Sequence, residues 1–354
     1  MKDDGRDGVV AEIEARAPGR VNLIGDHTDY TGGLVLPMAI DRWTTVRGAR
    51  DGARVTLRSD GFDEVCDLAL DGTDPSPTGW AAYVAGVIAE FAPSTGLRGT
   101  VRSTVPIGAG LASSAALEVA CGLALGFEGS ATELAQRCRR AEHRATGTPT
   151  GIMDQLASVS GVPGHALLID CRSLEVAPVK LCPVEEAEIV VVHSGTTHAL
   201  AHTAYAERVA ECEHAERVIG PLRDASVDDL PAIRDPTVLA RARHVITENM
   251  RVSAFVDALR LNDPTTMGAL MKESHVSLRD NYEVSIPEID ALVDRLINTR
   301  GVFGARMTGG GFGGCVVALC RPGSLDAIAM RHDAWIVRAV GGASVGRIPT
   351  RRSA

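Results

Sequence analysis

The stretch GRVNLIGDHTDYTGG, residues 19–33, decides how the rest of the chain is interpreted. An apolar run with Val21, Leu23 and Ile24 leads directly into the polar residues 26–29. An ordinary turn needs only one or two polar residues. A longer run of hydrogen-bonding side chains after a buried strand indicates a ligand site at the end of that strand.

The composition limits the classes of function. The chain has 354 residues, which exceeds one typical core, so we expect two domains. Hydrophobic residues make up 45% and charged residues 23%, as in globular proteins. The net charge is −9, so we expect neither nucleic acid nor an anionic membrane as a partner. An anionic ligand would need local backbone donors, a metal ion or single cations.

The sequence also favours a cytoplasmic location. The segment MKDDGRDGVVAEIEAR lacks the apolar centre of a signal peptide, and no run of 18 apolar residues could cross a membrane. The eight cysteines form no C-x-x-C pair and no disulfide-like spacing. They are typical of small core residues in a reducing compartment.

Hydrophobic periodicity predicts an α+β protein with a boundary near residues 190–200. TTVRGAR and RVTLRSD predict a hairpin around Asp51-Gly52. The stretch GVFGARMTGGGFGGCVVALC predicts a strand, a glycine loop and a second strand. The other predicted elements are helices over 80–91, 111–125 and 132–144, strands over 99–106, 165–171 and 188–194, and a mostly helical region over 205–300.

VPIGAGLASSAALEVA, residues 105–120, is a candidate phosphate loop. Gly108 and Gly110 permit close backbone approach, and Ser113 and Ser114 stand at a predicted helix start, where free N–H groups attract anions. A capped helix packed through small residues would explain the pattern equally well. The loop lacks the lysine of a Walker A motif. A bound triphosphate would therefore need Mg²⁺ and an acidic residue from elsewhere in the chain.

MTGGGFGG, residues 307–314, is the second glycine-rich loop. Its glycines permit positive φ angles between two strands. A tight, flexible hairpin is the alternative interpretation. Two unrelated glycine loops in one chain favour a nucleotide or phosphate site more than either loop does alone.

Three charged residues are candidates for chemistry. Asp154 stands among apolar neighbours, although an aspartate there could simply cap a helix. Glu142 lies on a charged helix and Arg20 in the opening stretch, where a solvated position is the alternative for each. His198 and His202 could share a helix face, but the H-E-x-x-H pattern of zinc sites is absent.

Three motifs in this order resemble the GHMP kinase superfamily: GRVNLIGDHTDYTGGLVLP, VPIGAGLASSAALEVA and MTGGGFGGC. The first is similar to the signature of the galactokinase family. AEHRATGTPTGIMDQLAS, HALLIDCRSLE and SLRDNYEVSIPEID also look galactokinase-like, so the resemblance covers essentially the whole chain. It implies a two-domain α+β fold with the active site in the interdomain cleft. It also implies an N-terminal domain over 1–190 and a ferredoxin-like C-terminal domain over 191–354 that carries the glycine-rich loop.

The resemblance also implies an activity in galactose metabolism, the transfer of the γ-phosphate of ATP to the anomeric hydroxyl of α-D-galactose. It makes Asp154 the catalytic base and Arg20 the group that stabilises transferred charge. The implied magnesium ligands are Ser114 and Glu142. The implied sugar ligands are Asp26, His27, Thr28, Asp29, Gly151, Asp154 and Tyr205. The implied ATP-binding residues are Gly108, Ala109, Gly110, Leu111, Ala112, Ser113, Ser114, Gly310 and Gly311.

The chain departs from the family pattern at two places. Asp26 stands where the family commonly has glutamate, so its carboxylate reaches one methylene less far. Residues 197–200 read Thr-His-Ala-Leu where the family often has Arg-His-Ser-Leu. The partners implied are galactose and Mg-ATP, for a monomer with a weak dimer as the alternative. The alternative functions are a kinase for N-acetylgalactosamine or another hexose, and a non-catalytic sensor that binds galactose and ATP.

Overall fold

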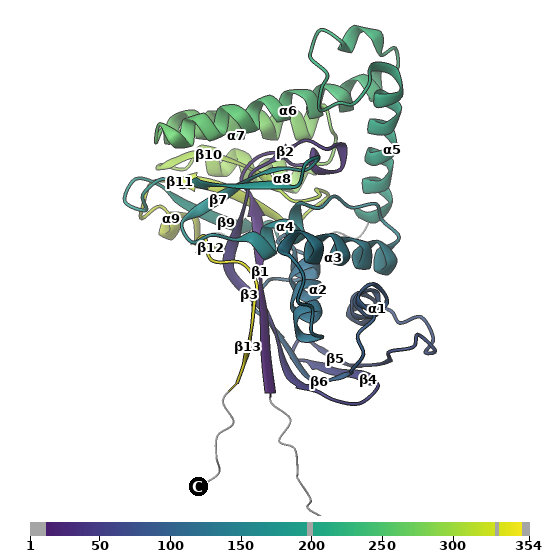
Figure 1. Ribbon diagram of the computed structural model, residues 1–354. Coiled ribbons are helices and arrows are strands. Elements are labelled where there is room, and N and C mark those ends of the chain that lie inside the picture. Colours follow the sequence, from purple (N-terminus) through teal and green to yellow (C-terminus); the bar gives the residue numbers. More distant parts are fainter. Residues whose placement is uncertain (1–11, 197–200, 330–332, 349–354) are drawn as a thin grey trace, which may run out of the picture.

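The computed structural model describes residues 12–196, 201–329 and 333–348, and its mixture of helices and sheets confirms the α+β class (Figure 1). In chain order the strands are β1 (Glu12–Asn22), β2 (Leu34–Val35), β3 (Pro37–Arg50), β4 (Arg54–Ser59), β5 (Phe62–Ala69), β6 (Leu97–Ser103), β7 (His165–Asp170), β8 (Glu175–Lys180), β9 (Glu188–His193), β10 (Val302–Thr308), β11 (Cys315–Cys320), β12 (Ala334–Val337) and β13 (Ser344–Arg347). The helices are α1 (Trp80–Phe91), α2 (Ser113–Ala124), α3 (Ala131–Thr146), α4 (Met153–Ser160), α5 (Ala201–Ile219), α6 (Pro236–Arg260), α7 (Pro264–Asp280), α8 (Pro287–Ile297) and α9 (Leu325–Ala329), with short 3₁₀ turns at Asp29–Thr31 and Leu230–Ala232.

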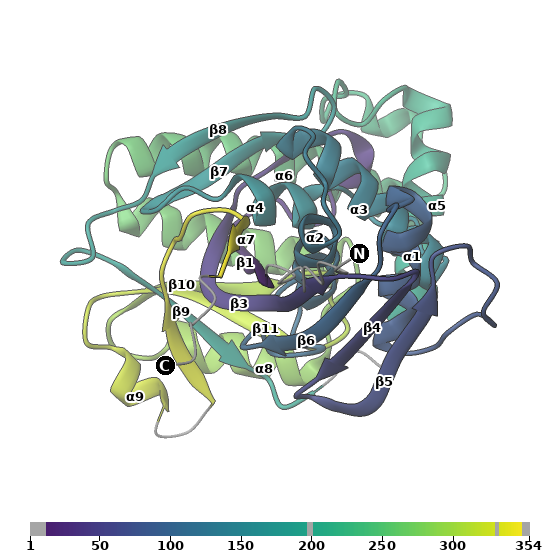
Figure 2. The same ribbon diagram turned by 60° about the horizontal axis from the view of Figure 1, so that its bottom comes forward.

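The largest sheet has the strand order β13-β1-β3-β6-β4-β5. Along β1, burial alternates over the first residues and then becomes continuous from Ala17 to Asn22. Alternation is typical of a sheet with one solvated face, whereas continuous burial marks a strand covered on both faces. Helices α2 and α4 pack against β1 and β3, and Figure 2 shows α2 and α4 close to these strands. The end of β1 therefore lies inside the molecule.

The hairpin predicted around Asp51-Gly52 is wrong. Strand β6 lies between β3 and β4, antiparallel to the first and parallel to the second. The Asp51 N–H donates to the Gly96 carbonyl over 3.0 Å, and the Gly96 N–H donates to the Gly52 carbonyl over 2.8 Å. The turn residues thus bond to the start of β6 rather than closing on each other. Local turn chemistry could not reveal a strand that inserts from later in the chain.

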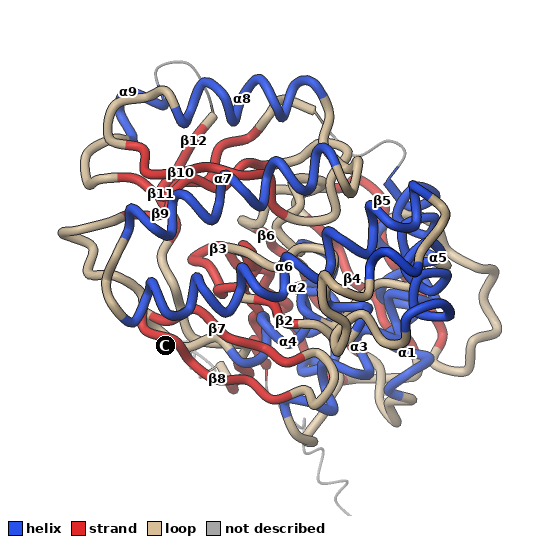
Figure 3. Tube along the Cα trace, turned by 90° about the horizontal axis from the view of Figure 1, so that it is seen from above, coloured by secondary structure: helices blue, strands red, loops and turns tan. Residues whose placement is uncertain are grey.

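The second sheet has the order β10-β11-β9-β12, with every pair antiparallel. Its strands β10 and β11 flank the second glycine loop, so the predicted order of strand, loop and strand is confirmed. Helices α7 and α8 pack on this sheet, and α6 packs beside α7, as Figure 3 shows. A small sheet, β2-β7-β8, adjoins α6. None of the helices in the described residues is both long and apolar enough to cross a bilayer.

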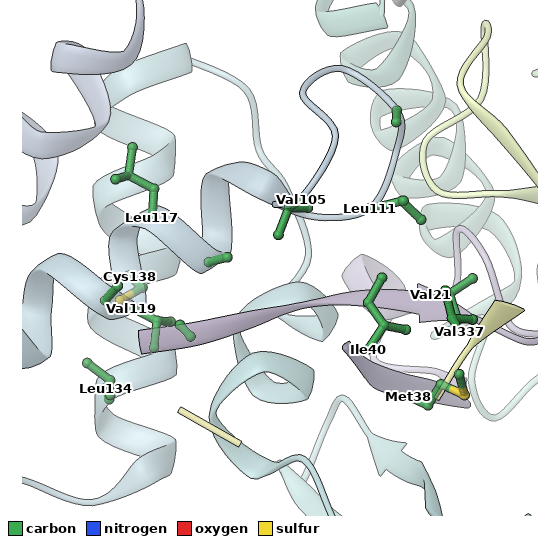
Figure 4. Packing of buried hydrophobic residues seen from close by; sticks show 14 of the residues in the cluster. Val21, Met38, Ile40, Val105, Leu111, Leu117, Val119, Leu134, Cys138 and Val337 are labelled. Atoms are coloured by element: carbon green, nitrogen blue, oxygen red, sulfur yellow. The ribbon is translucent and has the colours of Figure 1, made fainter. Parts of the chain in front are cut away.

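One hydrophobic cluster joins the first sheet to the candidate phosphate loop (Figure 4). Its labelled members come from β1, β3, the loop before α2, helices α2 and α3, and β12: Val21, Met38, Ile40, Val105, Leu111, Leu117, Val119, Leu134, Cys138 and Val337. Helix α2 begins at Ser113, two residues later than predicted, because Ala112 has a left-handed φ of 60°. This packing places the first turn of α2 beside the end of β1.

Candidate active site

A cavity of about 1130 Å³ collects most of the residues that the sequence singled out. Of the predicted site residues it is lined by Arg20, Asp26, His27, Asp29, Gly108, Gly110, Leu111, Ala112, Ser113, Ser114, Glu142, Gly151, Asp154, Tyr205 and Gly310. These come from β1, the loop after it, the start of α2, helices α3 to α5 and the second glycine loop. Segments from both halves of the chain therefore face one cleft.

Arg20 and Asp154 form a two-pronged ion pair in this cavity. Arg20 Nε donates to Asp154 Oδ1 over 2.8 Å, and Nη2 donates to Oδ2 over 2.6 Å. Nη1 donates to the Gly110 carbonyl over 2.5 Å. Arg20 is only 4% exposed, whereas the Asp154 side chain is 26% exposed. The guanidinium thus links the carboxylate to the phosphate loop and leaves that carboxylate open to the cavity.

The phosphate loop lies directly on β1. A Cβ atom at Gly19 would stand 2.7 Å from the Leu111 carbonyl oxygen, which accepts a hydrogen bond of 3.1 Å from the Arg20 N–H. Gly108 and Gly110 have φ angles of 68° and 73°, which favour glycine. Ser113 and Ser114 at the start of α2 line the cavity, and a helix start attracts anions.

Ser114 and Glu142 lie side by side at the same end of the cavity. The Ser114 hydroxyl donates to Glu142 Oε1 over 2.8 Å. Glu142 Oε2 accepts from Thr150 Oγ1 over 3.1 Å and from Gln155 Nε2 over 2.8 Å. Burial raises the pKa of Glu142, and the nearby Asp154 carboxylate raises it further. A cation at this position would relieve that repulsion.

The loop after β1 holds four predicted sugar ligands, of which Asp26 and His27 lie in different environments. Asp26 is buried, with Oδ2 2.5 Å from Arg306 Nη2 and Oδ1 3.1 Å from the Gly309 N–H. His27 has a positive φ of 64°, and its Nδ1 lies 3.1 Å from the Tyr30 hydroxyl. Burial lowers the pKa of His27 to about 3, so the ring is neutral at pH 7.

Asp29 connects this loop to the start of α4. The pKa of Asp29 is raised to about 6, mainly by burial and secondly by the charge of Asp154. A hydrogen bond from the Met153 backbone opposes this rise. Asp29 therefore caps α4, whose own N-cap residue has no side-chain cap. A Cβ atom at Gly151 would fall 1.6 Å from Asp29 Oδ2, so only glycine leaves room for the carboxylate. Tyr205 completes this wall, with its ring centre 5.5 Å from that of His27.

Three predicted residues lie away from the cavity lining. The Thr28 hydroxyl lies 2.9 Å and 2.6 Å from the Gly25 and Leu34 carbonyls and is buried. Ala109 is fully buried in the core. A Cβ atom at Gly311 would stand 2.5 Å from a backbone oxygen, which accounts for glycine there.

His198 lies outside the described residues, and the described part of the chain has no cluster of three or more His, Cys, Asp or Glu side chains suited to a metal.

Sequence reasoning missed two polar residues that support the site, Arg306 and Gln155. Arg306 is fully buried on β10 and ion-paired with Asp26, although the only signal was one arginine in an apolar strand. Gln155 follows Asp154 directly and contacts Glu142, but its adjacency gave no indication of this contact.

Comparisons with known proteins agree with this geometry. The galactokinase galactose-binding signature matches residues 8–50, the GHMP kinases N terminal domain matches residues 82–162, and the GHMP kinases C terminal model matches residues 255–334. The chain is 45% identical to the galactokinase of Homo sapiens and 44% identical to that of Chloroflexus aurantiacus. Each of these matches covers 92% of this chain and 88% of the relative.

The structure is similar to that of Lactococcus lactis galactokinase complexed with galactose, with a TM-score of 0.87 and 30% identity. That match covers 94% of this chain and 95% of the other. The fold, the order of the three motifs and the similarity along nearly the whole length agree with one another. The chain therefore belongs to the galactokinase family of the GHMP kinase superfamily.

Proposed function

We propose that the chain transfers the γ-phosphate of ATP to the anomeric hydroxyl of α-D-galactose, giving galactose 1-phosphate and ADP. The observation that carries this proposal is the Arg20–Asp154 pair, which stands between the phosphate loop and the loop with His27 and Asp29. A base for a hydroxyl and a cation for a phosphoryl group are needed at this junction. Phosphoryl transfer depends mainly on such positioning and on charge stabilisation.

In the proposed reaction the anomeric oxygen bonds to the γ-phosphorus, and the bond from that phosphorus to the bridging oxygen of ATP breaks. The hydroxyl proton passes to Asp154, whose side chain is 26% exposed and lines the cavity. Arg20 holds both carboxylate oxygens and the Gly110 carbonyl, so its charge stays close to the transferred group. This arrangement orients the base before the substrates bind.

Mg²⁺ is the proposed cofactor, with ATP as co-substrate, and Ser114 and Glu142 are its proposed ligands. A hydroxyl and a carboxylate fit magnesium, which takes oxygen ligands from one or two side chains together with phosphates and water. Their 2.8 Å contact faces the cavity beside the start of α2. Bound Mg²⁺ would supply charge neutralisation for the phosphates.

We expect Ser114→Ala to weaken binding of magnesium-nucleotide more than binding of galactose, and an unchanged magnesium titration would contradict the assignment.

The proposed sugar ligands are Asp26, His27, Asp29, Gly151, Asp154 and Tyr205, whereas Thr28 is proposed to shape the loop. Asp26 is the ligand that this chain's own contacts restrict most, since both oxygens already accept hydrogen bonds from Arg306 and Gly309. A site built from such fixed donors and acceptors discriminates against sugars that leave them unpaired.

The division at residue 190 is also a proposal. It is supported by the second sheet beginning nearby, at β9 (Glu188–His193), although position 190 itself lies within that strand and β13 returns to β1. A cytoplasmic monomer, with a weak dimer as the alternative, remains our proposal for location and assembly. All eight cysteines are free, which fits a reducing compartment.

The deciding experiment is an ADP-release assay with Mg-ATP and galactose, N-acetylgalactosamine, glucose or mevalonate. We expect galactose to give the highest kcat/KM. A higher value with N-acetylgalactosamine would favour the other hexose kinase. Binding of galactose and ATP without ADP release would favour the non-catalytic sensor.

A further inference from the structure

Glu118, on α2, is a carboxyl group in the interior that the proposed reaction does not use. Its exposed fraction is 0%. Within the residues that the structure describes, no cation pairs with it. An isolated buried carboxylate is very unfavourable, and such groups are normally paired or neutral. The polar groups around Glu118 must therefore stabilise its carboxyl group in a way other than ion pairing.

The hydrogen bonds around Glu118 leave two acceptors without a donor. Gln155 Nε2 donates to Glu142 Oε2 over 2.8 Å and to Glu118 Oε2 over 3.3 Å. The remaining oxygens of the pair, Glu118 Oε1 and Gln155 Oε1, are both buried without a partner. Rotating the amide would not help, because its oxygen would then face two carboxyl groups. The contacts therefore favour the orientation with Nε2 toward the two carboxyl groups, and one hydrogen is missing.

A single proton on Glu118 accounts for both unpartnered oxygens. An ionised carboxylate can only accept hydrogen bonds, whereas a carboxylic acid has one donor. Burial raises the pKa of Glu118 well above its usual range, and the carboxylates of Glu142 and Asp154 raise it further. A neutral acid and a primary amide can form two hydrogen bonds in one ring. The amide N–H to Glu118 Oε2 is the bond already present.

We propose that Glu118 is a carboxylic acid whose O–H donates to Gln155 Oε1, and that this acid–amide pair is a positioning unit which holds Gln155 Nε2 against Glu142. Glu142 in turn receives the Ser114 hydroxyl, so the pair orients both proposed magnesium ligands from behind. The effect on magnesium rests on the proposed function, whereas the assignment of the proton to Glu118 is independent of it.

The neutral state also suits the position of Glu118 in the helix. Glu118 lies four residues after Ser114, one turn from the start of α2. The N-terminal end of a helix attracts anions through its N–H groups and its dipole. A negative charge in the next turn would weaken that attraction. A proton on Glu118 therefore keeps the start of α2 favourable for phosphate.

The substitution Glu118→Gln tests the proton directly, since glutamine has the same shape and supplies the same donor and acceptor. We expect Tm to be unchanged and the infrared carbonyl band of one neutral carboxylic acid to disappear at about pH 8, where ordinary carboxyls are ionised. Glu248→Gln is the matched contrast. Glu248 is equally buried, but Arg251 Nε lies 2.8 Å from it, so its loss of charge should lower Tm clearly.

A retained infrared band in Glu118→Gln would overturn the proposal, as would a fall in Tm comparable to that of Glu248→Gln. These readouts require no turnover, so they hold even if the enzyme proves to act on another sugar.

The positioning role is tested by the affinity for magnesium-ADP, measured by calorimetry without sugar. Gln155→Leu should weaken it about tenfold, as loss of a group that orients a metal ligand commonly does. Glu118→Gln should stay within about twofold of the unchanged protein. Nucleotide binding without magnesium should change little in both variants. Unaltered magnesium-ADP affinity in Gln155→Leu would overturn the positioning role and leave the proton assignment to the infrared result.

Discussion

Asp154 accepts two hydrogen bonds from Arg20 and still faces the cavity, an environment that suits its proposed role as the base. The sequence placed an acid among apolar residues and an arginine 134 positions earlier, but nothing local joins them. The pair exists because the end of β1 and the start of α4 meet in three dimensions. A substitution that removes only the charge of Asp154 can separate its role as proton acceptor from its role in positioning.

We expect Asp154→Asn to lower kcat by about 10² to 10⁴, the usual contribution of a positioned base, with little change in galactose affinity. The amide keeps the shape but cannot take the proton. Turnover and galactose binding should be measured on the same preparation. Asp235→Asn is the matched control, because Asp235 only caps α6 and asparagine caps equally well. Near-normal turnover in Asp154→Asn would remove this residue from the base role.

Asp29 should give the folding stability a distinct pH dependence. Its pKa is about 6 in the folded protein against an ordinary 3.8, so the folded state binds the proton more tightly. The stability from this group is complete below about pH 4 and is lost as the pH rises through about 6. The asparagine of Asp29→Asn cannot titrate. The unfolding free energy of this variant should therefore rise relative to that of the unchanged protein as the pH increases from about 4 to about 6. Urea unfolding at a series of pH values measures the difference, and parallel curves would contradict it.

Short elements decide how closely the functional groups approach each other. Helix α4 starts at Met153 and is capped by Asp29 from a distant loop, with Gly151 leaving the space for that carboxylate. The loop with Asp29 and the helix carrying Asp154 are therefore one packed unit. A change in either should disturb the other.

The substitution Gly151→Ala should destabilise the protein by roughly 1–3 kcal/mol and raise the KM for galactose, because the new methyl group would displace Asp29. Gly341→Ala is the control, since a Cβ atom there would meet nothing within 4 Å. Thermal unfolding and steady-state kinetics would follow both variants. Equal unfolding temperatures and equal KM values for the two variants would show that Asp29 can be displaced without an effect on stability or on galactose binding.

Element prediction succeeded where the signal was local and failed where it was not. The span of α1 could be predicted to the residue, since apolar periodicity identifies a helix. The hairpin at Asp51 failed because β6, 45 residues later, takes the place of the expected partner strand. In the site, the motif residues were identifiable, whereas Arg306 and Gln155 act only through contacts between distant segments.

At the scale of the whole molecule, one buried ion pair ties the second glycine loop and its sheet to the loop after β1. Arg306 on β10 binds Asp26 after β1, and the Gly309 N–H binds the same carboxylate. Both side chains are almost fully buried. The pair therefore joins the second sheet to the loop that carries the proposed sugar ligands, and it sets where that loop stands.

Arg306→Met should cost about 3–5 kcal/mol of unfolding free energy, because it leaves the Asp26 charge buried without its cation. Adding Asp26→Asn should recover part of that loss, since the unpaired charge is then removed. Denaturant unfolding of the two single variants and the double variant gives the coupling directly. Strictly additive losses would show that the pair does not act as a unit.

Strand β13 has a consequence for how the chain is made. Arg16 of β1 lies opposite Ser344 of β13, and 328 residues separate them. At about 5 to 20 residues per second, the ribosome needs on the order of tens of seconds to supply that partner. Throughout this time the edge of β1 stays open, and open edges invite pairing with other chains. Translation speed and chaperone binding during synthesis should therefore affect the yield of this protein.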